Sequence, residues 1–429
     1  MTQTTVSRVS LVSAVAPVSA LLISVAILLA GTGLQGTLLP IRANLENFAP
    51  FELGVLGTVY FAGFTLGCAF GPAVVRRAGH IRAFLAMTSL SSVVPLLHVM
   101  DVSPMSWWIL RASSGFCFAV LYIVIESWLN EKSDNTTRGM VFSVYTIVNL
   151  TVITVGQMMV GLADPGTFLL FGLASILVSV AAIPIAFTAA ASPTPPEFVR
   201  PRLRRLYKIS AAGTAGCFAV GLANGAFWAL GPVFAHDLGF DTAGVGLYMS
   251  AVVLGGALGQ WPLGRLSDRL DRRLVMIIAS VIAIAAALLT LVLAEGDRSG
   301  MLLAALLFGA GAFPLYPIAV AHANDSADPS DYVEVSSGLL LIYGAGAAVG
   351  PMLAALLRAY AGMPVLFFFT AAVHIVLIAF VVWRMKARDA RAPEDRVVFA
   401  DAVIAAQTVT NFDPLSVQAS ENEADKAAT

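Results

Sequence analysis

The chain alternates between long apolar runs and short polar joints. Each apolar run is about 20 residues long, which is the length that an α-helix needs to cross roughly 30 Å of hydrocarbon. The pattern predicts twelve membrane-spanning helices, at approximately 17–40, 53–75, 81–100, 105–128, 139–162, 166–188, 209–235, 243–264, 274–294, 300–321, 335–358 and 363–384.

One longer polar segment, proline-rich and then basic, divides these spans into two sets of six. We therefore expect an all-α membrane protein with an N-terminal half at 1–190, a cytoplasmic linker at 191–208 and a C-terminal half at 209–386. The sequence then turns polar, and residues 387–429 are expected to form a disordered cytoplasmic tail.

The composition agrees with this class, because 58% of the residues are hydrophobic and 12% are charged, against roughly 25% charged residues in soluble domains. A net charge of −1 gives no field that would attract nucleic acid. The three cysteines lie inside apolar spans without CxxC spacing, and no two histidines have metal-ligand spacing. We expect no metal and no cofactor. No phosphate-binding GxxxxGK[ST] loop and no hydrolase grouping occurs either, so we expect no enzyme activity.

The basic residues predict the orientation of the chain. If both termini are cytoplasmic, 21 of the 25 Lys and Arg residues lie on the cytoplasmic side, as the positive-inside rule requires. The exception is the tenth joint, 322–334, which is acidic and carries no basic residue. Its side follows from the alternation of the spans alone. The first apolar run is too long for the core of a signal peptide and is expected to remain as the first helix.

The two halves resemble each other. Sliding the chain by 193 positions superposes Gly71 on Gly264 and Arg76 on Arg269, at the ends of the second and eighth spans. The joint that follows the eighth span combines Gly264, Asp268 and Arg269. A glycine lets a neighbouring helix approach closely, an aspartate can meet a helix N-terminus or an arginine, and arginines hold a loop at the cytoplasmic side.

This joint resembles the inter-helix motif of the major facilitator superfamily, and further residues resemble its YcaD-like bacterial branch. They are Gly54-Val55, Tyr60-Phe61, Val124-Ile125-Glu126-Ser127, 259–269, Leu315-Tyr316-Pro317, Leu339-Leu340-Leu341 and Gly350-Pro351. The resemblance implies twelve helices in two pseudo-symmetric six-helix halves, with a small-molecule site at their interface. It also implies a monomer in the inner membrane, and a conformational latch in which Gly264, Asp268 and Arg269 meet Arg138 at the start of the fifth span.

Two positions depart from the superfamily pattern. Val75 stands where the first half would carry the acidic residue of the latch. The fifth span carries Gly156-Gln157 in place of the Gly-Pro pair of antiporters. The sequence therefore gives no basis for an antiporter assignment.

Arg111 is the candidate with the clearest physical argument, because a charge at mid-bilayer costs at least about 2.5–3.5 kcal/mol unless it faces a cavity or a partner. At 100° per residue it shares one stripe with Gly115, Phe118, Tyr122 and Glu126. We expect Arg111 and Tyr122 to bind substrate. The alternative is that Arg111 extends to the periplasmic headgroups.

Glu126 lies near the cytoplasmic end of this stripe. Together with Arg111 it is a candidate for proton coupling or gating, and pairing with Arg138 or capping of the helix end are the alternatives. Further candidate substrate contacts lie on the first, seventh and tenth spans, where packing is the alternative for each: Gln35, Asn224, Trp228, Phe313 and Tyr316. Pro314 and Pro317 are expected to kink the tenth span.

These features favour a secondary active transporter that moves a small organic solute by alternating access. Its partners would be the lipid bilayer, the solute and protons, and the aromatic character of the candidates favours efflux over uptake. An uncoupled facilitator and an uptake symporter are the nearest alternatives. A membrane sensor or assembly partner on a transporter scaffold is the alternative from another class.

Overall fold

The computed structural model describes residues 15–133, 137–188, 202–294, 296–328, 331–362 and 364–387, together with Arg396 and Phe399. Twelve helices in these residues are long and apolar enough to cross a membrane, which confirms the predicted all-α membrane fold. Most of the predicted linker and of the tail at 387–429 lies outside the described residues.

The first half begins with a short turn and contains six spans. Proline at the first position starts two of them, where its missing N–H group costs no hydrogen bond. The elements are η1 (Ala16–Val18), α2 (Ser19–Leu45), α3 (Pro50–Ala78), α4 (His80–Met100), α5 (Pro104–Lys132), α6 (Arg138–Met158), η2 (Met159–Leu162), α7 (Leu169–Val180) and α8 (Ala182–Ala186).

The second half follows a short linker helix. Asp241 and Asp297 cap two of its spans, since each carboxylate accepts a hydrogen bond from a first-turn N–H group at 2.9 Å. The elements are α9 (Leu203–Ile209), α10 (Ala211–Asp237), α11 (Thr242–Arg269), α12 (Arg272–Leu293), α13 (Arg298–Ala312), α14 (Leu315–Asn324), α15 (Tyr332–Ala361) and α16 (Val365–Ala387).

The tenth span is broken between α13 and α14, at Phe313 and Pro314. Proline cannot donate to the carbonyl four residues earlier, so Pro314 frees the carbonyl of Ala310. That carbonyl faces Gly259 on α11, where an added Cβ would collide with it. The helix is therefore interrupted at Pro314, within the single span Arg298–Asn324.

Close helix crossings recur in the two halves. In the first half, Gly115 of α5 packs against the carbonyl of Tyr60 on α3. In the second half, Gly309 of α13 packs in the same way against the carbonyl of Val252 on α11. Glycine permits both contacts because no side chain separates the backbones.

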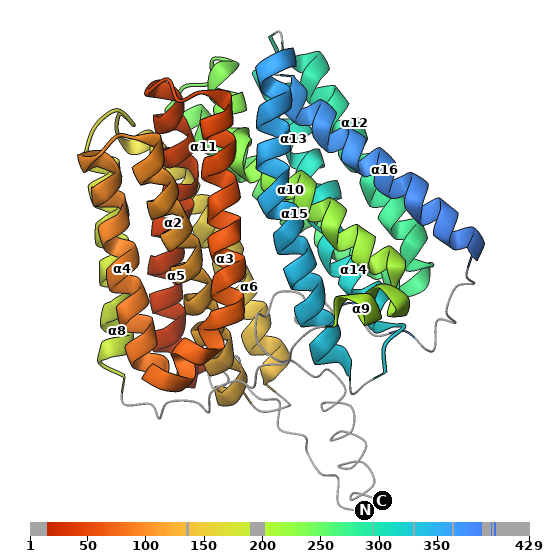
Figure 1. The fold of residues 1–429 in the computed structure, drawn as a ribbon, viewed down its shortest axis with the longest axis horizontal. Coiled ribbons are helices and arrows are strands. Elements are labelled where there is room, and N and C mark those ends of the chain that lie inside the picture. The colour runs from red at the N-terminus through yellow and green to blue at the C-terminus, as the bar shows by residue number, and fades with distance from the viewer. Residues whose placement is uncertain are drawn as a thin grey trace, which may run out of the picture.

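The halves lie side by side in Figure 1, the first in red to yellow-green and the second in green to blue. We call the end of the bundle where α2 begins and α16 ends the terminal face, and the opposite end the far face. A buried apolar cluster crosses the boundary between the halves, with Leu38 and Leu56 on one side and Leu230 and Ala354 on the other. Hydrogen bonds across the boundary join Asn44 to Asp237 (3.0 Å), Thr58 to Ala348 (2.7 Å) and Ser250 to Thr154 (3.3 Å). These contacts all lie in the part of the boundary toward the far face.

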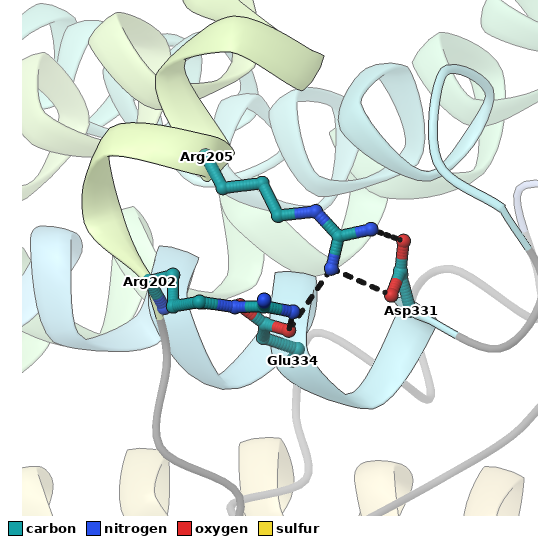
Figure 2. Close-up of polar contacts among 4 residues, drawn as sticks. All are labelled: Arg202, Arg205, Asp331 and Glu334. Carbon is teal, nitrogen blue, oxygen red and sulfur yellow. Dashed lines mark hydrogen bonds and ion pairs between the residues drawn. The ribbon is translucent and has the colours of Figure 1, made fainter.

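The linker helix α9 is held against the start of α15 by ion pairs (Figure 2). Arg202 donates to both carboxylate oxygens of Glu334 at 2.9 and 2.7 Å. Arg205 donates to both oxygens of Asp331 at 3.0 and 2.6 Å. These pairs explain why the tenth joint is acidic, because its carboxylates neutralise the basic linker on the same face of the protein.

Candidate functional site

A cavity of about 460 Å³ lies between the two halves. This volume falls within the range of small-molecule sites. Helices α2, α3, α5 and α6 of the first half form most of its wall, and α10, α14 and α15 of the second half complete it. The site is therefore shared by the two halves of the repeat.

Arg111 lines this cavity and is partly exposed to it. Its guanidinium carbon lies 4.2 Å from the centroid of the Tyr60 ring, which is a cation–π contact. The contact follows from the close crossing of α3 and α5, where Gly115 meets the backbone of Tyr60. Within the described part of the chain, Arg111 makes no ion pair and no hydrogen bond.

The predicted stripe on α5 faces the same cavity. Phe118, Tyr122 and Glu126 line it, whereas Gly115 serves the packing of α5 on α3. The Glu126 side chain is 1% exposed. Fifteen residues separate Arg111 from Glu126, so the two groups lie about 22 Å apart along the helix axis, with Glu126 toward the terminal face.

Tyrosines and an amide surround Glu126. Tyr122 and Tyr145 lie within electrostatic range of its carboxyl group, and Asn149 lies near both tyrosines. All of these residues line the cavity. This end of the cavity therefore holds an acidic side chain among groups that can exchange protons and hydrogen bonds.

The other candidate contacts divide into two groups. Gln35, Trp228 and Tyr316 lie on the cavity wall. Phe313 stacks on the outer side of Trp228, with ring centroids 5.6 Å apart. Asn224 is buried near Tyr343, and its side-chain oxygen has no hydrogen-bond partner among the described residues. Phe313 and Asn224 thus lie one layer behind the cavity wall.

Several wall residues were not among the sequence-based candidates. On α3 they follow helical spacing: Gly57, Tyr60, Phe61, Phe64, Thr65 and Cys68. On α6 they recur at every fourth position: Tyr145, Asn149, Ile153 and Gln157. The spacing on α6 was visible in the sequence, and it marks one polar and aromatic stripe on an otherwise apolar span.

The predicted latch residues lie at the terminal face. Asp268 accepts a hydrogen bond from the backbone N–H of Phe399 at 2.9 Å and lies 3.7 Å from the guanidinium of Arg272. Gly264 packs against the Phe399 ring. Arg269 is exposed at the end of α11, and Arg138 is the first residue of α6.

Two further aspartates order this joint. Asp325 pairs with Arg272 at 2.7 Å, and both side chains are buried. Asp271 caps α12 and binds the Arg273 side chain at 2.7 Å. Burial alone would raise the pKa of Asp271, but the hydrogen bonds and charge of Arg273 outweigh it and hold this pKa below its usual value. Among the described residues, no group of three His, Cys, Asp or Glu could hold a metal ion.

Twelve spans in two repeated halves around a shared cavity define the class of alternating-access membrane transporters. Comparison with known proteins agrees with this class. The model of the Major Facilitator Superfamily matches residues 213–414. This match, together with the relatives below, supports a secondary transporter that resembles this superfamily.

Its relatives lie in the YcaD-like branch. The uncharacterized MFS-type transporter YcaD of Escherichia coli O17:K52:H18 (strain UMN026 / ExPEC) is 27% identical over 365 residues, which cover 84% of this chain and 94% of that protein. The nucleoside transporter NupG has a similar fold, with a TM-score of 0.74 at 13% identity over 86% of this chain and 99% of that one. A bacterial homologue of the human lysosomal transporter Spinster, in an inward-facing and occupied conformation, gives a TM-score of 0.68 at 14% identity over 92% and 97%.

Proposed function

We propose that this protein is a proton-coupled transporter that exports a small organic solute across the inner membrane, with both termini in the cytoplasm. The observation that carries the proposal is the cavity itself, because its wall contains Arg111 and Glu126 of one helix and aromatic side chains from both halves. A solute in this cavity would contact both halves. It could therefore bias their relative orientation.

Alternating access requires that one end of the cavity closes while the other opens. The buried cluster and the hydrogen bonds between the halves lie toward the far face. In the proposed orientation the far face is periplasmic, so we assign this structure to a state closed at the periplasmic side. In the opposite state, Asp268 would meet the start of α6 near Arg138.

Glu126 is the acidic side chain on the cavity wall and therefore our candidate proton carrier. One proton moving through 100 mV releases about 2.3 kcal/mol, which can sustain roughly a fiftyfold gradient of a neutral solute. Export is favoured over uptake by the wall, which is mainly aromatic and apolar. An uncoupled facilitator and an uptake symporter share the same cavity, and a membrane sensor or assembly partner would share the fold.

The test begins with a thermal-shift screen of the purified protein against metabolites and drugs, followed by transport of each hit in proteoliposomes. We expect a solute found in the screen to accumulate against its own concentration gradient when a pH gradient is imposed. Accumulation should stop when a protonophore collapses the pH gradient. Movement that ignores the pH gradient would indicate a facilitator. A solute that binds but never crosses would contradict the transport proposal and favour a sensor.

A further inference from the structure

We propose that the transported solute is an organic anion with an aromatic body, and that its acid group binds Arg111. This inference rests on the proposed transport function and names the substrate class. The Arg111 guanidinium lies inside a membrane span and still has N–H groups that can donate hydrogen bonds. In the described residues its contact is the Tyr60 ring face, which leaves the planar N–H groups of Arg111 available to the cavity.

Two buried amides lie in the same part of the cavity. The side chains of Gln35 and Gln157 are 4% and 2% exposed, and one polar atom of each amide has no hydrogen-bond partner. Both residues line the cavity. From the helical rise, Arg111, Gln35 and Gln157 all lie within about 15 Å of the far face. A polar group of the solute would satisfy these amides as well as the guanidinium.

Charge decides between the classes of solute. A carboxylate can bind a guanidinium through two parallel hydrogen bonds and would neutralise the charge that Arg111 places in the membrane. A cationic solute would be repelled by Arg111, and a neutral one would leave its charge uncompensated. The rings of Tyr60, Phe64, Tyr122 and Trp228 line the remaining wall and favour an aromatic body for the solute.

The test compares matched acids and amides, which share size and shape but differ in charge. The probes are 2-naphthoate and indole-3-acetate with their primary amides, and binding is measured by titration calorimetry on the protein in nanodiscs. We expect each acid to bind at least about tenfold more tightly than its amide. Arg111→Gln should remove this preference by weakening acid binding much more than amide binding, and Arg111→Lys should retain part of the preference because it keeps the charge but loses the planar fork.

Arg265→Gln is the matched control, because Arg265 also stacks on an aromatic ring, that of Trp261, but is exposed outside the cavity. It should behave as the unmodified protein. Amide binding by Arg111→Gln shows that the variant is folded. Equal binding of acids and amides, an acid preference that survives Arg111→Gln, or no binding by either series would overturn the substrate class. The pH-gradient test above would still decide the transport function.

At the terminal face, Arg396 and Phe399 lie against the end of α11. The Phe399 ring is 7% exposed and packs on Gly264, where an added Cβ would collide with it. The Phe399 N–H donates to Asp268 at 2.9 Å, and Arg396 donates to the carbonyl of Leu270 at 2.6 Å. These contacts occupy two of the residues that the proposed closed terminal face would use.

We infer that docking of Arg396 and Phe399 competes with closure of the terminal face and stabilises the state described here. This inference uses the proposed transport cycle but is independent of the solute. Removing the ring or the guanidinium should release the end of α11 toward the first half. Asp268→Asn should not have this effect, because asparagine can still accept the hydrogen bond from Phe399 while losing the charge that would meet α6.

The test uses distances between spin labels at Arg77→Cys and Leu274→Cys, which are exposed on different halves near the terminal face, in a chain without its native cysteines. Phe399→Ala should add a population with a shorter distance, and Arg396→Gln should add a smaller one. Lys386→Gln, which removes a charge from the exposed end of α16, should leave the distances unchanged. Distances that are the same in all four proteins would overturn the competition.

Discussion

Arg111 and Tyr60 face each other across the crossing of α3 and α5, with 4.2 Å between the guanidinium carbon and the ring centroid. The glycine contact at the crossing brings the two helices close enough for this pair to form. The ring supports the charge on one side, and the cavity lies on the other.

Arg111→Ala should abolish transport, and Arg111→Lys should reduce it by about tenfold or more, because lysine cannot reproduce the planar fork of arginine. The measurement is the initial rate of solute transport in proteoliposomes. Both variants should be produced and purified like the unmodified protein. Normal rates in both would mean that Arg111 serves packing against Tyr60 and not transport.

Glu126→Gln should separate solute movement from proton movement. The amide keeps the size of the side chain but cannot carry a proton, so exchange of solute down its own gradient should continue. Accumulation driven by a pH gradient should be lost. If Glu126→Gln accumulates solute as well as the unmodified protein does under a pH gradient, Glu126 is excluded as the proton carrier.

Asp325→Asn should destabilise the protein by about 3–5 kcal/mol, because it leaves the buried Arg272 guanidinium without its carboxylate. The melting temperature in detergent should fall accordingly. Asp328→Asn is the control, since Asp328 lies in the same joint but is exposed. Equal melting temperatures for the two variants would show that the buried pair contributes little.

The architecture could be predicted from the sequence because the bilayer constrains span length and composition so strongly. All twelve expected spans have a counterpart in the structure, with ends that differ by a few residues. Pro314 marked the weak point of the tenth span for a purely local reason, the missing N–H group.

The cavity wall was harder to predict, because it depends on how helices rotate against one another. The helical stripe on α5 placed Tyr122 and Glu126 on one face, and both lie on the wall. The contribution of α3 was missed, since Tyr60 and Phe64 look like ordinary packing residues until α5 is placed beside them. The docking of Phe399 on Gly264 could not be foreseen either, because 135 positions separate the two residues and no periodic pattern links them.

Both termini and the linker should be cytoplasmic, because the basic residues gather at their face of the bundle. Reporter fusions at Ser192 and at the C-terminus should both show cytoplasmic activity. A periplasmic signal from either fusion would reverse the proposed orientation, and with it the side to which this state is closed.

The central claim is that one cavity between the halves is reached from the two sides of the membrane in turn. Gly36→Cys is a suitable probe, because Gly36 lines the cavity and an added Cβ there would meet open space. In a chain without native cysteines, a membrane-impermeant thiol reagent should label this position from either side. A disulfide between Asn44→Cys and Asp237→Cys, which replaces a hydrogen bond across the far end of the boundary, should block labelling from the far side and spare labelling from the terminal side. Labelling from neither side, or from both sides regardless of the cross-link, would contradict alternating access through this cavity.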